Sequence, residues 1–256
     1  MKYLINYMWV IAVVLLTACG DDESSVVVPS DRGTVADTDG NVYNWVRIGD
    51  LQWTTSNARN GTDMCDLQYF DGWDYVDAFS ESKKEELRKD YIPVYGNLMS
   101  YEDALASAPE GWRLPSDEDW QALERMLGMA DTDSKGWRGK DSAFKMMEET
   151  GGTELALRIG GICTWKAVYG WMELELDYVK EYGYYWTSTI DPSYTDHEAA
   201  YYRKLCFGRG SVERQCGTTD KLMNVRWVRY YSERWLSSLS CRVICLILFF
   251  NLPFLY

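Results

Sequence analysis

Histidine and cysteine are the side chains from which catalytic and metal sites are most often built. This chain has one histidine and seven cysteines, and their spacing favours neither kind of site. The one histidine, His197, lies in the polar stretch 191–198, and no nucleophile-elbow sequence lies near it. Carboxylates are abundant, yet no pair stands out for glycoside hydrolysis. We therefore expect a solvated loop histidine, no catalytic residue, no cofactor and no enzyme activity.

Six cysteines besides Cys19 offer disulfides or metal ligands. No two are spaced Cys-x-x-Cys, and with a single histidine this argues against a zinc site, so no metal site is expected. In an exported protein six cysteines allow fifteen pairings. Cys206 and Cys216 flank a predicted turn, and they are the pair that the spacing favours. The other four are Cys65, Cys163, Cys241 and Cys245.

The N-terminal segment has the pattern of an export signal. Lys2 precedes an apolar run from Trp9 to Leu16, and small residues follow. The sequence Leu16-Thr-Ala-Cys19 resembles the lipobox of bacterial lipoproteins, in which the leader is cleaved and the cysteine is acylated. We predict a signal peptide over residues 1–18 and lipidation of Cys19. An ordinary cleaved signal with a chance cysteine is the alternative.

Acylation would attach the protein to a membrane without a spanning helix, because several acyl chains together give stable anchoring. Residues 19–33 are rich in Asp, Ser and Gly without periodicity, which predicts an acidic tether. The expected location is therefore the bacterial cell envelope, lipid-anchored at the outer membrane or the cell surface. The membrane is the first expected partner.

Composition limits the remaining functions. The net charge of −13 argues against nucleic-acid binding, which needs a basic surface. The length suits one large domain. Twelve tryptophans and nineteen tyrosines offer flat rings with a polar tip, which serve both cores and ligand sites.

Two helices are predicted from capping residues and periodicity. Ser100 caps a segment over 101–108, and Ser116 caps a segment whose first turn is acidic. Trp120, Leu123 and Leu127 then recur on one helical face, and Gly128 ends the segment. The polar run 80–89 predicts a solvated helix within an irregular insertion over 60–95.

Strands are predicted on both sides of these helices. Asp39-Gly40 favours a type I′ hairpin turn within 33–49. Later segments dense in strand-forming residues cover 184–189, 199–207, 211–216 and 225–229, whereas the Gly-rich stretch 129–183 reads as irregular. Trp112, Trp120 and Trp186 are expected in the core, and Arg113 as a structural partner of a carboxylate or a carbonyl.

Several ordered blocks resemble the Fibrobacter succinogenes major paralogous domain of bacterial surface lipoproteins and together cover residues 37–229. The blocks are Asp39-Gly-Asn-Val-Tyr43, Val46-Arg-Ile-Gly49 with Trp53, Tyr95-Gly96 with Tyr101 and Ala104, Gly111-Trp-Arg-Leu-Pro-Ser116 with Trp120, Gly160-Gly161, Tyr185-Trp-Thr-Ser-Thr189, Ala200 with Arg203-Lys-Leu205, and Val225-Arg226. The resemblance implies an α+β, C-type lectin-like fold with two helices on a small, mostly antiparallel sheet and long irregular loops. The domain is placed at 34–229.

Such a fold implies a ligand site in its variable loops, here 129–183. Trp137, Trp165, Tyr169 and Trp171 fall there, and the C–H face of a sugar stacks on aromatic rings. The calcium-lectin motifs Glu-Pro-Asn and Trp-Asn-Asp are absent. We therefore predict a non-catalytic cell-surface binding module for glycans, with a glycan or a surface protein as partner.

Two other function classes stay open. One is a structural or assembly component of a surface appendage or a polysaccharide-handling complex. The other is an enzyme related to the formylglycine-generating enzymes, whose cysteine pair finds no clear match in Cys163, Cys206 or Cys216.

The chain also departs from the family pattern. Trp227 stands where the family usually has cysteine, and 60–95 is longer than expected. The apolar tail 230–256 has no counterpart, and it is too short and too interrupted for a confident membrane span. It either covers an apolar patch or is a non-native, frame-shifted or read-through end.

Overall fold

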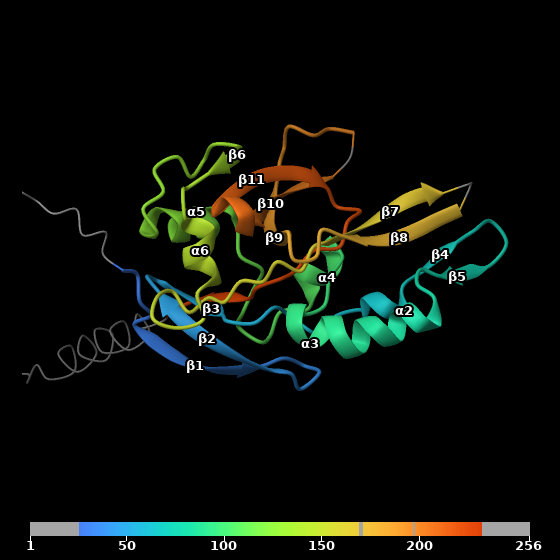
Figure 1. Ribbon diagram of the computed structural model, residues 1–256, viewed down its shortest axis with the longest axis horizontal. Helices are drawn as coiled ribbons and strands as arrows, with labels where there is room; N and C mark the ends of the chain where they lie inside the picture. The colour runs from blue at the N-terminus through green and yellow to red at the C-terminus, as the bar shows by residue number, and fades with distance from the viewer. Residues whose placement is uncertain (1–25, 169–170, 197, 232–256) are drawn as a thin grey trace, which may run out of the picture.

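A computed structural model describes residues 26–168, 171–196 and 198–231, and within them two four-stranded antiparallel sheets form the body (Figure 1). The first sheet has the order β1 (Asp31–Ala36), β2 (Val42–Ile48), β3 (Leu51–Thr54), β12 (Val228–Tyr230). The second, called the central sheet below, has the order β6 (Gly136–Arg138), β11 (Ser211–Thr218), β10 (Ala199–Cys206), β9 (Tyr182–Ile190). Each sheet joins distant parts of the chain.

Two hairpins project from this body, and in Figure 1 they lie at the opposite end of the long axis from the first described residues. They are β4 (Gln68–Phe70) with β5 (Tyr75–Asp77), and β7 (Ile162–Val168) with β8 (Trp171–Asp177).

The helices are short. They are η1 (Met64–Asp66), α2 (Glu81–Glu86), η2 (Leu87–Tyr91), α3 (Ile92–Tyr95), α4 (Tyr101–Ala106), α5 (Asp117–Met126), α6 (Ser142–Met147) and η3 (Phe207–Arg209). None of the helices in the described part of the chain has the length and apolar character needed to cross a bilayer.

Capping sets the starts of α4 and α5 as predicted, whereas α4 ends at Ala106, two residues before its predicted end. The Ser100 side chain accepts from the Asp103 N–H, and Ser116 forms a reciprocal capping box with Asp119. After α5, Gly128 adopts a positive φ of 90°, which suits glycine at a helix end. These local signals were sufficient to predict both helix starts.

The core lies between the two sheets, with α5 as its centre. The Trp120 ring is fully buried and packs 5.0 Å from Trp53 of the first sheet and 5.8 Å from Tyr185 of the central sheet. Trp112 and Trp186 are buried in a neighbouring cluster. The expectation that these motif tryptophans serve the core is confirmed.

The chain is α+β as predicted, but it is richer in strands than one small sheet. The segment 129–183, expected to be irregular, contains β6, α6, β7 and β8. The polar run at 80–89 is helical, yet Leu87 and Tyr91 anchor it in a buried cluster, so it is less solvated than predicted.

Some predicted boundaries shift. Residues 31–33 of the predicted tether belong to β1, and Tyr230 of the predicted tail ends β12. The β1–β2 loop is not a type I′ turn, because only Gly40 has positive φ and the Asp37 carboxylate instead accepts the N–H groups of Asp39 and Asn41. The predicted signal peptide 1–18, Cys19, and the tail from residue 232 lie outside the described residues, as do His197, Cys241 and Cys245.

Candidate functional site: two faces of the central sheet

Strand β10 divides its side chains between two faces of the central sheet. Arg203 is fully buried against α5, whereas Lys204, the next residue, lies on the opposite face and is partly exposed. This alternation follows from the period of two in a strand. The two faces have different chemistry.

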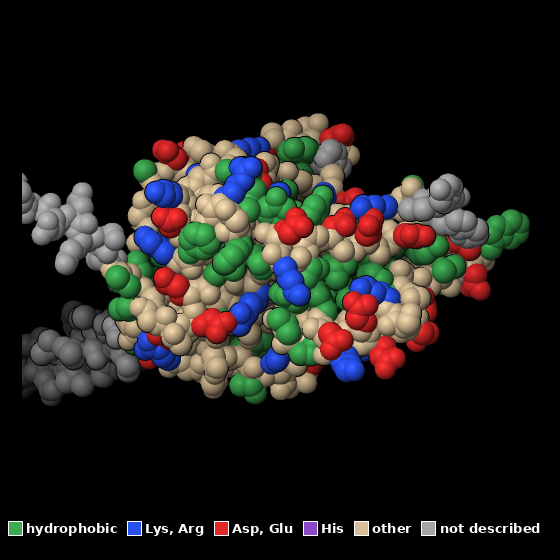
Figure 2. Space-filling model, viewed as in Figure 1, with side chains coloured by type: hydrophobic (Ala, Val, Ile, Leu, Met, Phe, Trp, Pro, Cys, Tyr) green, Lys and Arg blue, Asp and Glu red, His purple; other side chains and the backbone are tan. Residues whose placement is uncertain are grey.

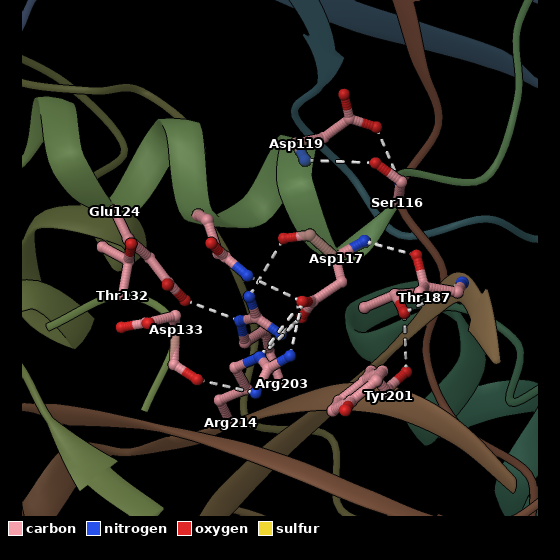
Figure 3. Close-up of polar contacts among 12 residues, drawn as sticks. Ser116, Asp117, Asp119, Glu124, Thr132, Asp133, Thr187, Tyr201, Arg203 and Arg214 are labelled. Atoms are coloured by element: carbon pink, nitrogen blue, oxygen red, sulfur yellow. Dashed lines mark hydrogen bonds and ion pairs between the residues drawn. The ribbon is translucent and has the colours of Figure 1, made fainter. Parts of the chain in front are cut away.

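The inner face carries a buried network of charges, which Figure 3 shows between α5 and the strands below it. The Arg203 guanidinium donates to Glu124 Oε1 and to Asp117 Oδ1, each at 2.6 Å. Arg214 Nη2 lies 2.8 Å from Asp117 Oδ2. Both carboxylates come from α5, so these pairs hold the helix on the sheet.

Arg138 of β6 completes the network, with Nη2 at 2.6 Å from Glu124 Oε2. Burial has the largest effect on the pKa of Arg138 and lowers it. Burial alone would raise the pKa of Asp117, but the hydrogen bonds and charges of Arg214 and Arg203 outweigh it, so this pKa is lowered. Guanidinium groups hold both carboxylates, which favours structural pairing over proton transfer.

Other motif residues also hold the fold together. Arg226 is 1% exposed and donates to Asn57 Oδ1 at 2.6 Å and to three backbone carbonyls; burial lowers its pKa to about 10. Arg113 pairs with Asp119 and donates to the Leu114 carbonyl, as expected. Thr187 Oγ1 donates to the Tyr201 carbonyl at 2.8 Å, so it serves the sheet.

The outer face is aromatic. Register places Trp137 of β6, Glu213 of β11, Lys204 of β10 and Tyr184 of β9 in one row across the four strands. Tyr182 and Tyr202 flank this row, with ring centroids 6.3 Å and 6.2 Å from Tyr184. We call these six residues, with Gln215, the aromatic face.

One cation lies among the rings of the aromatic face. Lys204 Nζ is 4.2 Å from the Tyr182 centroid, 5.3 Å from Trp137 and 5.5 Å from Tyr184. These are cation–π distances. Tyr184 is buried, whereas the residues around it on the aromatic face are half-buried and provide its exposed part.

Of the four predicted ligand residues, the structure places one in the aromatic face. Trp137 lies there, whereas Trp165 sits on β7 with its ring edge-on to Tyr69 at 6.1 Å, partly buried in another cluster. Trp171 begins β8, but its side chain and all of Tyr169 lie outside the described residues. The expectation of one loop site containing both Trp137 and Trp165 is wrong, because the two rings belong to separate sheets.

The rest of the aromatic face was missed from the sequence. Tyr182 and Tyr184 alternate on β9, and Tyr202 and Lys204 alternate on β10. This alternation with a period of two was the sequence signal that could have predicted the aromatic face, because alternate residues of a strand lie on one face of the sheet.

The predicted disulfide between Cys206 and Cys216 is wrong. Cys206 lies opposite Ser211 and Cys216 opposite Tyr201, five register positions away on the same hairpin. That offset is roughly 17 Å along the strands, whereas a disulfide needs Cα atoms within about 7 Å. The odd offset also places the two side chains on opposite faces. Both thiols are free.

The thiols are poorly suited to nucleophilic chemistry. Burial raises the pKa of Cys65 to about 12 and that of Cys216 to about 11, which leaves little thiolate at neutral pH. Among the described residues no group of His, Cys, Asp and Glu is arranged to hold a metal ion.

The comparison with family models matches residues 46–229 to the Fibrobacter succinogenes major domain, which is well over half of the chain. The chain belongs to this family. Comparisons with curated proteins and with solved structures find no match. Within the matched range of this Fibrobacter succinogenes major domain, the buried Arg203 and Arg226 are motif positions that build the fold, and Trp137 and Lys204 are on the aromatic face.

Proposed function

We propose that this protein is a non-catalytic binding module of the cell surface that takes glycans on the aromatic face. The observation that carries the proposal is the row of Trp137, Glu213, Lys204 and Tyr184 across the central sheet. Aromatic rings suit the C–H faces of a sugar, and the polar atoms beside them suit its hydroxyl groups. Ligand sites commonly combine these two features.

Rigidity of the central sheet supports the same function. The inner face is fixed to α5 by the buried pairs of Arg203 and Arg214, so the rings of the outer face are held before any ligand arrives. A preorganised site loses less conformational entropy on binding. The fold we assign to this arrangement is C-type lectin-like.

The cellular setting in this proposal is the bacterial envelope. A signal peptide over residues 1–18 would be removed, and acylated Cys19 would anchor the chain in the outer membrane or at the cell surface. In Figure 1 the first described residues lie at one end of the long axis and the two hairpins at the other. An anchor at the N-terminus would thus leave the hairpins far from the lipid.

A glycan array tests the binding function with the full-length protein, Trp137→Ala and a matched control, Trp73→Ala. Trp73 is 92% exposed on the β4–β5 hairpin, so its loss removes an aromatic ring away from the aromatic face. We expect glycan signals that Trp137→Ala loses and Trp73→Ala keeps. Absence of binding by the wild type, or unchanged binding by Trp137→Ala, would contradict the proposal.

The exposed tip of the β4–β5 hairpin favours a second candidate, an assembly component of a surface appendage or a polysaccharide-handling complex. Phe70, Trp73 and Tyr75 are 59%, 92% and 68% exposed, and Figure 2 shows hydrophobic side chains at the outer end of this hairpin. Exposed apolar groups of this kind mark interaction sites. A protein partner pulled down from envelope extracts by the wild type and lost with Trp73→Ala would support assembly; capture unaffected by Trp73→Ala would count against it.

A further inference from the structure

Resting on the proposed function, we infer that the glycan bound by the aromatic face is anionic, carrying carboxylate or sulfate groups. The inference begins with Lys204. Its ammonium lies among three rings and forms an ion pair with Glu213 at 3.7 Å, yet it makes no hydrogen bond to another described residue. That distance exceeds a normal hydrogen bond. The three donors of the ammonium therefore remain available.

The carboxylate beside Lys204 has another partner. Gln215 Nε2 donates to Glu213 Oε1 at 2.9 Å, and the Glu213 side chain is only 12% exposed. Glu213 is thus engaged within the sheet, whereas the Lys204 side chain is more exposed, at 21%. An incoming anion would meet Lys204 first.

A second cation borders the same ring. The Arg209 guanidinium, on the turn between β10 and β11, lies 5.4 Å from the Trp137 centroid and is solvent-exposed. Among the described residues no carboxylate forms an ion pair with Arg209. Arg209 and Lys204 therefore flank Trp137, in a chain whose net charge is −13.

The charged groups of both side chains lie over aromatic rings, Lys204 Nζ at 4.2 Å from the Tyr182 centroid and the Arg209 guanidinium at 5.4 Å from that of Trp137. Ring contact of this kind keeps long side chains in place and lowers the entropy lost when they bind. Hydrogen bonds from a cation to a carboxylate or a sulfate are about twice as strong as neutral ones. Two fixed cations beside a ring therefore select an acidic sugar over a neutral one.

The test measures binding of the full-length protein to polygalacturonate, to its carboxyl-reduced neutral form and to dextran sulfate. Variants are Lys204→Gln and Arg209→Gln, with Lys166→Gln as a charge-matched control. Lys166 is an exposed lysine on β7, paired with Glu175 and Asp177, away from the aromatic face. Arg209 is exposed, so its variant should fold even if Lys204→Gln is destabilised.

We expect at least one acidic polymer to bind. Lys204→Gln and Arg209→Gln should each weaken this binding about tenfold, and Lys166→Gln should bind as the wild type. Binding to polygalacturonate would identify a carboxylate as the recognised group. Binding to dextran sulfate alone would identify a sulfate. Equal binding of the reduced polymer would overturn the anionic inference and leave glycan binding standing. If the wild-type protein binds no glycan, neutral or acidic, both the anionic inference and the proposed glycan-binding function are overturned.

Discussion

Arg203 and Lys204 are neighbours on β10, but their side chains leave the strand on opposite faces. Arg203 is fully buried and bonds Glu124 at 2.6 Å, whereas Lys204 lies 4.2 Å from the centroid of the Tyr182 ring. One strand therefore fixes α5 to the sheet and also presents the cation of the proposed binding face. Stability and binding can be tested separately at adjacent positions.

Asp117→Asn should destabilise the protein strongly. The change removes the carboxylate that Arg203 and Arg214 share, leaving buried guanidinium charge unpaired. We expect the free energy of unfolding to fall by about 3–5 kcal/mol. Urea denaturation at pH 7 measures this. Glu118→Gln, exposed on the same helical turn, is the control and should stay within about 0.5 kcal/mol of the wild type. Equal stability of the two variants would contradict the structural role of the network.

The same variant should alter the dependence of stability on pH. The pKa of Asp117 in the folded protein lies below its ordinary value of 3.8. The contribution of Asp117 to stability is therefore complete above pH 3.8 and is lost as the pH falls through the lower pKa of the folded state. The wild type should therefore lose more stability than Asp117→Asn between pH 5 and pH 2. Urea unfolding across this range measures the two slopes, and parallel curves would exclude Asp117 as a source of acid sensitivity.

Local signals accounted for much of the fold, whereas pairing between distant segments did not follow from them. Ser116 and Gly128 mark the ends of α5 because capping depends on a few adjacent residues. The strand β6 has three residues and no periodicity, and it pairs with β11 about 75 positions later. Without that register, Trp137 could not be placed beside Glu213 and Lys204. The predicted ligand residues therefore share only Trp137 with the aromatic face.

Gly161 should tolerate substitution far worse than Gly151, although both have positive φ. A Cβ at Gly161 would lie 2.2 Å from the Asp177 carbonyl oxygen, whereas one at Gly151 would meet nothing within 4 Å. Gly151→Ala should cost about 1–2 kcal/mol from its backbone conformation alone. Gly161→Ala should cost roughly 2 kcal/mol more, because backbone must move. Chemical denaturation of both variants gives the difference, and equal losses would show that the close approach is unimportant.

Cys206 and Cys216 should never be linked to each other in the folded protein. Their register offset and opposite faces prevent a bond without breaking the β10–β11 pairing. Peptide mapping under non-reducing conditions should recover the two cysteines in separate peptides. Recovery of a cross-linked Cys206–Cys216 peptide would mean that this hairpin has a different register.

Lipidation of Cys19 is testable in cells. Growth with an alkyne fatty acid should label the wild type and leave Cys19→Ala unlabelled, because acylation requires that thiol. Cys65→Ala, which removes a buried thiol, is the control and should keep the label. An unlabelled wild type would exclude the acyl anchor.

The most direct test of the binding face is a two-dimensional NMR titration that follows the tryptophan indole N–H signals of the protein, assigned by single substitutions. The ligand is the polymer that gives the strongest array signal, cut to short oligosaccharides. The account predicts that the Trp137 signal shifts with ligand concentration while the signals of Trp73 and Trp165 stay in place. Movement of Trp73 or Trp165 with an unchanged Trp137 signal would contradict it.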